Sequence, residues 1–84
     1  MPWFVYLARC ADGTLYCGAT NDVAARLATH NAGKGARYTR ARLPVELAAK
    51  FRCRNKRAAL KLEYRIKQLT RAEKQKMISS DCSR

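Results

Sequence analysis

The side chains of this sequence best suited to acid–base and phosphate chemistry are two tyrosines, an arginine, a histidine and a glutamate. They are Tyr6, Tyr16, Arg26, His30 and Glu63, with Gly18 two residues after the second tyrosine. Hydrolysis of a phosphodiester needs an activated water, neutralisation of the phosphate and stabilisation of the leaving oxygen, and a divalent metal can supply the last two. We therefore interpret this set as the machinery of a metal-assisted phosphodiester hydrolase.

The glutamate and the arginine each have a role in that chemistry and an ordinary structural alternative. One carboxylate plus waters is an adequate ligand set for Mg²⁺, which keeps much of its hydration in proteins, so we expect Glu63 to hold the metal. The alternative is a helix-surface glutamate paired with Lys or Arg. The planar donor fork of Arg26 suits the scissile phosphate, and its alternative is a surface ion pair with Asp22, four residues earlier.

Tyr6 and Tyr16 are expected to flank the attacking water. A free tyrosine has a pKa of about 10, so a tyrosine base needs help from a metal or a nearby cation. The alternative for both is hydrophobic packing in a strand, and the sequence does not decide which tyrosine takes the proton. His30 is expected either to orient the phosphate and assist proton transfer or simply to be stabilised by a helix dipole.

The charge of the chain is uneven and points to a polyanionic partner. The net charge is +12, and residues 34–76 carry fifteen of the eighteen Lys and Arg but only three of the six acidic residues. Such a block favours nucleic acid first and an anionic membrane surface second. Because contacts to phosphate carry no sequence information, we expect recognition of nucleic-acid structure rather than of base sequence.

A basic loop over residues 34–42 is the predicted contact with the phosphate backbone. The expected nucleic-acid-binding residues are Lys34, Arg37, Tyr38, Arg40, Arg42 and Lys67. Tyr38 either stacks on a base or packs against the protein. A second basic set, Arg57, Lys61 and Arg65, repeats at four-residue spacing and is predicted to be a solvated face turned away from Glu63.

Two short strands must position the tyrosines. Residues 3–10 and 15–19 are rich in aromatic, branched and other strand-forming side chains and predict a hairpin. A two-residue loop would put Tyr6 and Tyr16 on opposite faces, whereas a three-residue loop ending at Gly13 pairs Tyr6 with Gly18 and puts both rings on one face. The chemical interpretation requires the three-residue loop.

The rest of the chain predicts one helix, one strand and two further helices. Candidate caps in Thr20-Asn21-Asp22, at Asn55 and in the Thr70–Glu73 capping box, together with apolar periodicity, predict helices over residues 22–30, 56–69 and 71–78. A strand is predicted over residues 45–52. The order β-β-α-β-α-α predicts an α+β fold in which helices flank a small antiparallel three-stranded sheet. A single domain is expected over residues 3–78, with a frayed tail over 79–84.

Other classes of protein fit the sequence poorly. The apolar run at residues 3–8 is too short to span a bilayer, and no signal-peptide pattern surrounds it, so the expected location is the cytoplasm. The four cysteines form no C-x-x-C pair, and we expect them to be reduced thiols rather than disulfides or zinc ligands.

The ordered motifs resemble the GIY-YIG nuclease domain, and in particular its small stand-alone bacterial members. The first motif reads Phe4-Val5-Tyr6 and the second Tyr16-Cys17-Gly18, followed after eight residues by Arg26. The first motif lacks the Gly and Ile of the family, and Cys17 replaces the usual aliphatic residue. The segment Asn31 to Thr39 (NAGKGARYT) is similar to that of the small members, and the resemblance covers roughly residues 3–78.

The resemblance implies a DNA endonuclease that uses one Mg²⁺ or Mn²⁺ ion in DNA repair or recombination. It implies catalytic roles for both tyrosines, Arg26 and His30, and metal binding by Glu63. The alternative is a non-catalytic module on the same scaffold that binds DNA or RNA, since a domain of this size has no separate targeting domain. A protein partner that supplies targeting is compatible with either interpretation.

Overall fold

A three-stranded antiparallel sheet with helices on both faces forms the fold. The computed structural model describes residues 2–35 and 37–82. Its elements are β1 (Trp3–Arg9), β2 (Leu15–Thr20), α1 (Val23–Asn31), α2 (Arg37–Arg40), β3 (Glu46–Cys53), α3 (Lys56–Lys67) and α4 (Arg71–Cys82). The strand order is β2-β1-β3, so β1 is central and β2 is an edge strand. The predicted α+β class and the order β-β-α-β-α-α are confirmed, with the one-turn helix α2 added.

The hairpin has the three-residue loop that the tyrosines require. The amide of Cys10 donates to the carbonyl of Thr14 at 2.8 Å, and the amide of Gly13 donates to the carbonyl of Cys10 at 2.9 Å. Gly13 takes a φ of 85°, a conformation that glycine adopts at little cost. In the resulting register Tyr6 lies opposite Gly18, and Ala8 lies opposite Tyr16. Both tyrosine rings therefore lie on the same face of the sheet, as predicted.

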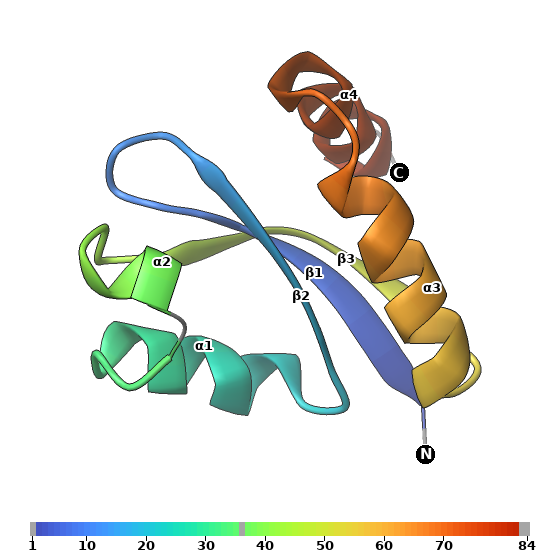
Figure 1. The fold of residues 1–84 in the computed structure, drawn as a ribbon, viewed down its shortest axis with the longest axis horizontal. Coiled ribbons are helices and arrows are strands. Elements are labelled where there is room, and N and C mark those ends of the chain that lie inside the picture. Colours follow the sequence, from blue (N-terminus) through green and yellow to red (C-terminus); the bar gives the residue numbers. More distant parts are fainter. Residues whose placement is uncertain (1, 36, 83–84) are drawn as a thin grey trace.

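The sheet separates two hydrophobic clusters. One contains Tyr6, Ala8, Cys10, Val23 and Val45, and the other contains Val5, Leu7, Cys17, Ala49, Ala59, Ile66 and Ile78. Figure 1 shows α1 and α2 on one side of the sheet and α3 and α4 on the other. The helices that carry Arg26 and Glu63 thus cover opposite faces, and only a site built around the edge strand β2 can use both.

The helix caps are those that the sequence predicts. The carboxylate of Asp22 accepts from the amide of Ala25, and the side chain of Asn55 accepts from the amide of Ala58. At the start of α4, Thr70 and Glu73 form a reciprocal capping box, each side chain accepting from the other residue's amide. The Asp22 carboxylate therefore caps α1. Asp22 is also the residue that the structural alternative pairs with Arg26.

Two connections differ from the prediction. The loop after α1 contains the turn α2, and α3 ends at Lys67 rather than at residue 69, because the next residues form the approach to the capping box of α4. Helix α4 continues to Cys82 rather than ending at residue 78, and the fraying of the tail over 79–84 stays a prediction. No Gly or Pro follows residue 78, and nothing in the sequence stops the helix there. The last two residues of that tail, 83–84, lie outside the described residues.

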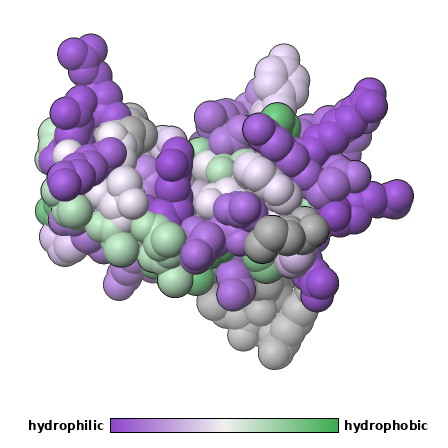
Figure 2. Space-filling view, turned by 90° about the horizontal axis from the view of Figure 1, so that it is seen from below, coloured by the Kyte–Doolittle hydropathy of each residue, from purple (hydrophilic) through white to green (hydrophobic). Residues whose placement is uncertain are grey.

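The face of the molecule that Figure 2 shows is mostly hydrophilic. Seen from below in Figure 2, hydrophilic residues surround a pale apolar strip on the side where α1 lies. Within the part of the chain that the structure describes, no helix combines the length and the apolar character that crossing a membrane requires.

Candidate active site

A buried chain of hydrogen bonds holds Tyr6 in place. The Tyr6 hydroxyl lies 2.9 Å from Nε2 of His30, and Nδ1 of His30 lies 2.9 Å from the hydroxyl of Thr39. The exposed fractions of Tyr6, His30 and Thr39 are 1%, 0% and 0%. A neutral imidazole satisfies both contacts, donating from one nitrogen and accepting at the other. His30 therefore contacts Tyr6 and Thr39 directly and does not reach the surface.

Two glycines make room for this chain. A Cβ atom at Gly18 would lie 2.5 Å from the Tyr6 hydroxyl oxygen and 2.6 Å from Cζ of the same ring. A Cβ atom at Gly35 would collide with Nδ1 of His30. Gly18 has ordinary backbone angles, so its requirement is space rather than conformation. The glycine of the second motif is thus explained by the tyrosine of the first.

Replacing Gly18 by Ala should lower the free energy of unfolding by about 1–3 kcal/mol, because the methyl group displaces a packed ring. The measurement is urea denaturation of the single variant and of Gly18→Ala in a Tyr6→Ala background. In that background the methyl group has space, so the second substitution should cost much less. Equal costs in the two backgrounds would show that the ring is not what excludes a side chain.

The environment of Tyr6 keeps its hydroxyl protonated. Burial raises the pKa of Tyr6 from 10.0 to about 12, and the nearby Arg26 guanidinium, which lowers this pKa, offsets only part of the effect. The same guanidinium adds to burial in holding the pKa of His30 below its ordinary value. Arg26 itself is exposed on α1. The structure therefore brings Arg26 to the solvent side of the Tyr6–His30 pair.

The shifted pKa of His30 predicts a loss of stability on mild acidification. Burial and Arg26 lower the pKa of His30 from 6.5, so below that pH the unfolded chain binds more protons than the folded protein. We expect the free energy of unfolding to be highest above pH 6.5 and to fall below it, by at most about 1.4 kcal/mol per pH unit from this residue. Denaturation between pH 7.5 and 5.5 measures the slope. In His30→Gln, which retains a donor and an acceptor, the slope should be smaller, and an unchanged slope would contradict the assignment.

Tyr16 joins this cluster from the edge strand. Its ring centroid lies 6.3 Å from that of Tyr6 and 5.3 Å from that of His30, the latter in an edge-on arrangement. Unlike Tyr6 and His30, Tyr16 is only half-buried. It also lines a cleft of about 270 Å³, the β2 cleft, together with Leu15, Cys17, Lys67 and Lys74.

Glu63 lies on α3 beside Lys67, which lines this cleft. Its carboxylate lies 3.6 Å from the Lys67 ammonium, one helical turn on, and 19% of its side chain is exposed. Cys17 is its neighbour on β2: the thiol lies 3.9 Å from the backbone carbonyl of Glu63. Burial raises the pKa of Cys17 to about 11, and the Glu63 carboxylate acts in the same direction.

The predicted site residues therefore form two groups that meet at β2. Tyr6, Tyr16, Arg26 and His30 gather on the α1 face, whereas Glu63 lies on the α3 face in an ion pair with Lys67. Tyr16 is the link, because it contacts the first group and lines the cleft that Lys67 also lines. The structural alternative for Glu63, a glutamate paired with Lys or Arg, predicts such an ion pair.

The residues around Glu63 suit a hydrated hard cation. Among the described residues, no three His, Cys, Asp or Glu side chains gather to form a metal-binding cluster. A partly exposed carboxylate is a hard oxygen ligand of the kind Mg²⁺ prefers, with water completing the coordination. With its raised pKa, the neighbouring Cys17 stays a thiol and is not a competing thiolate ligand.

Part of the predicted nucleic-acid-binding loop forms the one-turn helix α2. Arg37 and Arg40 lie exposed on α2, and Lys34 is exposed before it. Arg42 instead pairs with Asp12, its Nε lying 3.0 Å from the carboxylate, and its carbonyl accepts from the amide of Ala11. Arg42 thus fastens this segment to the hairpin loop. The side chain of Tyr38 lies outside the described residues.

Several residues of the site were not identified from the sequence. Thr39 and Gly35 fix His30, Lys74 lines the β2 cleft, and Asn31 exchanges two hydrogen bonds with the backbone of Val45, at 2.8 and 3.0 Å. Asn31 thereby holds the end of α1 against the start of β3, next to His30. For Asn31, Gly35 and Thr39 the only signal is their place in the segment 31–39, which resembles the small members of the family, and Lys74 has no such signal.

Comparison with known proteins places these motifs in a family. The GIY-YIG catalytic domain pattern matches residues 2–77. The chain is 49% identical over 79 residues to a UPF0213 protein of Desulfotalea psychrophila. The aligned residues cover 93% of this chain and 72% of that protein. It is 51% identical over 79 residues to a UPF0213 protein of Lactococcus lactis, covering 93% and 81%.

A solved structure agrees in fold and sequence. The solution NMR structure of a UPF0213 protein from Bacillus halodurans superposes with a TM-score of 0.60 at 42% identity, covering 94% of this chain and 84% of the other. The shared pattern, the three-stranded sheet and the ordered motif residues agree with one another. The chain therefore belongs to the GIY-YIG catalytic domain family and has its nuclease-type fold.

Proposed function

We propose that this protein is a metal-dependent endonuclease that hydrolyses DNA phosphodiester bonds at the β2 cleft. The observation that carries the proposal is the position of Tyr16, which contacts Tyr6 and His30 and lines the same cleft as Lys67, the partner of Glu63. Membership of the GIY-YIG family supports nuclease chemistry and nucleic-acid binding in general.

In this proposal Tyr16 first loses its own hydroxyl proton to solvent and then, as a phenolate, takes the proton of the attacking water. Tyr6 is less suited to act as the base. Burial raises its pKa to about 12, so very little of its phenolate form is present near neutral pH, and its hydroxyl is already bonded to His30. Tyr16 is half-buried at a cleft that the substrate can reach. The rings of Tyr6 and His30, which belong to the hydrogen-bonded chain with Thr39, pack against the Tyr16 ring and so limit its orientation.

The cations around the cleft bind the phosphate. The exposed Arg26 offers two parallel donors to phosphate oxygens, and Lys67 and Lys74 add positive charge from the α3 side. Glu63 would hold the divalent ion, which stabilises negative charge on the phosphate and on the leaving oxygen when bound. When Glu63 holds a cation, the Lys67 ammonium can turn from the carboxylate to the phosphate.

The charge distribution supports binding that reads nucleic-acid structure. The exposed Lys34, Arg37 and Arg40 follow the helix that carries Arg26 and would contact the backbone beside the cleft. We propose DNA as the substrate, a role in DNA repair or recombination, and a cytoplasmic location. A partner protein that targets the enzyme to its substrate is part of the same proposal.

The test is incubation of the purified chain with supercoiled plasmid and with branched DNA, in Mg²⁺, in Mn²⁺ and in a chelator. We expect nicking or cutting with either metal and none with the chelator.

The Glu63–Lys67 ion pair favours a second candidate, a nucleic-acid-binding module without activity. Tight binding that does not depend on metal, with no cleavage of any branched or plasmid substrate, would establish that alternative.

A further inference from the structure

We propose that the outer face of α3 binds an unpaired nucleic-acid strand, with Tyr64 stacking on a base. The surface, which we call the α3 groove, is lined by Lys56, Arg57, Leu60, Lys61, Tyr64 and Arg65 and has a volume of about 870 Å³. The inference rests on the proposed function for the class of ligand, nucleic acid, but it needs no cleavage.

The groove exposes apolar side chains that the fold does not use. Leu60 is 45% exposed and Tyr64 is 69% exposed, and among the described residues Leu47 is the only other large hydrophobic residue that is exposed. Leu60 and Tyr64 lie four residues apart, so they are neighbours on the same face of α3. Two adjacent exposed hydrophobic side chains on so polar a helix mark a contact surface rather than scattered exposure.

The charge of the groove selects a polyanion. Lys56, Arg57, Lys61 and Arg65 all line it and no acidic residue does. Within the described part of the chain, none of these four cations is in an ion pair with a carboxylate, and the Lys56 ammonium lies 5.4 Å from the centroid of the Trp3 ring. The sequence predicts this basic set to be a solvated face, and the structure adds the exposed aromatic ring beside it.

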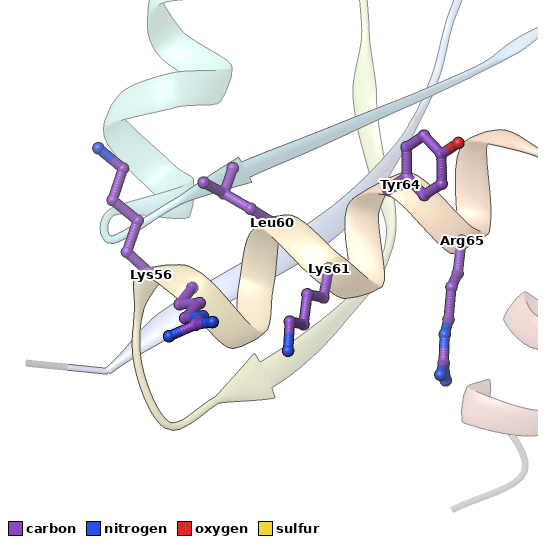
Figure 3. Close-up of a pocket in the computed structure, with 6 residues that line it drawn as sticks. Lys56, Leu60, Lys61, Tyr64 and Arg65 are labelled. Carbon is purple, nitrogen blue, oxygen red and sulfur yellow. The ribbon is translucent and has the colours of Figure 1, made fainter.

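The arrangement of the side chains suits a single strand. In Figure 3, Lys61 and Arg65 extend from one side of α3, whereas Leu60 and Tyr64 extend from the other. A strand along the helix can therefore place phosphates on the cations and a base on the ring. Stacking on a side chain needs an open base face, which an unpaired strand offers and the interior of a duplex does not.

The groove lies on the same helix as Glu63. Tyr64 follows Glu63 directly, and Leu60 lies three residues before it, one turn along the helix. A strand that leaves the β2 cleft past Glu63 reaches Leu60 and Tyr64 next. The substrate class that this geometry favours is DNA with an unpaired segment beside the scissile bond.

The experiment is fluorescence anisotropy with a labelled oligothymidine and with a duplex of equal length, in a chelator so that cleavage plays no part. Tyr64→Ala should weaken binding of the single strand about ten-fold or more, whereas Tyr64→Phe, which keeps the ring, should bind like the unaltered protein. The duplex should be much less affected by Tyr64→Ala. Lys61→Gln with Arg65→Gln should weaken binding of both and reduce its salt dependence.

The matched control is Arg52→Gln with Lys76→Gln, which removes the same charge from exposed positions outside the groove. An equal loss in the control pair, or unchanged binding by Tyr64→Ala, would overturn the proposal. Binding of polyglutamate that depends on Tyr64, without such dependence for the oligonucleotide, would instead assign the groove to an acidic protein. If the chain binds the single strand through Tyr64 but cuts no DNA, the proposed function fails and this inference stands.

Discussion

Replacing Tyr16 by Phe should lower the metal-dependent rate of DNA cleavage by about 10²–10⁴-fold, the usual effect of removing a general base. The substitution removes only the hydroxyl oxygen and keeps the ring that contacts Tyr6 and His30. Single-turnover cleavage of a labelled branched DNA measures the rate, and thermal denaturation checks the fold.

Tyr6→Phe is the matched comparison, because it removes the same atom from the buried tyrosine. It leaves Nε2 of His30 without its partner, and an unsatisfied buried polar atom costs about 1–3 kcal/mol of stability. We expect Tyr6→Phe to lose less rate than Tyr16→Phe. A larger loss of rate in Tyr6→Phe, at a temperature where both variants are folded, would assign the base to Tyr6 instead.

Replacing Glu63 by Gln should lower cleavage by about 10²–10³-fold or more, the scale seen when a group that stabilises the transition-state charge is removed. The amide keeps the shape of the side chain but loses the negative charge that holds a divalent ion. The affinity for Mn²⁺, followed by its paramagnetic effect on solvent relaxation, should fall together with the rate. Binding of DNA in a chelator should stay the same or become tighter, because the protein loses one negative charge and the Lys67 ammonium loses its carboxylate partner.

Glu46→Gln is the matched control for this prediction. It makes the same change of charge at an exposed carboxylate on β3, whose partner is Arg9 at 3.8 Å. We expect cleavage and Mn²⁺ affinity close to those of the unaltered protein. Cleavage that survives Glu63→Gln would remove the metal role of Glu63 and leave its ion pair with Lys67 as its function.

The proposed roles of Tyr16 as the base and of Tyr6 as a residue that packs against it follow from the different positions of the two tyrosines in the sheet. Both lie on the same face of the sheet, yet Tyr6 is on the central strand and Tyr16 on the edge strand. The central position buries Tyr6 against His30, and the edge position leaves Tyr16 open to the β2 cleft. The tyrosines of the two motifs thus acquire different chemical environments because one lies on the central strand and the other on an edge strand.

The elements that the sequence predicted well are those governed by local chemistry. The three-residue loop needs a residue that accepts positive φ, and Gly13 supplies it at the expected place. The caps at Asp22 and Asn55 and the box of Thr70 and Glu73 use side chains that bond to backbone within three residues. Such interactions can be predicted because they depend on a few consecutive residues.

The sequence did not predict what surrounds His30. Its partners, Tyr6 and Thr39, lie 24 and 9 residues away, and Thr39 belongs to an irregular segment without periodicity. The sequence left open an orienting role at the phosphate for this histidine. The structure instead shows a fully buried imidazole, because Gly35 lets the backbone approach the ring closely and Thr39 covers its other nitrogen.

The sequence by itself determined the order of the strands and of the three longer helices along the chain, and the family that the chain resembles. These follow from side-chain periodicity, turn residues and motif spacing, which act over short distances along the chain. Only the tertiary structure decided that α1 and α3 cover opposite faces and that Tyr16 joins the two groups of site residues at an edge strand. The physical reason is that an amphipathic helix specifies which side it buries, whereas the face of the sheet it covers depends on all the elements packing together.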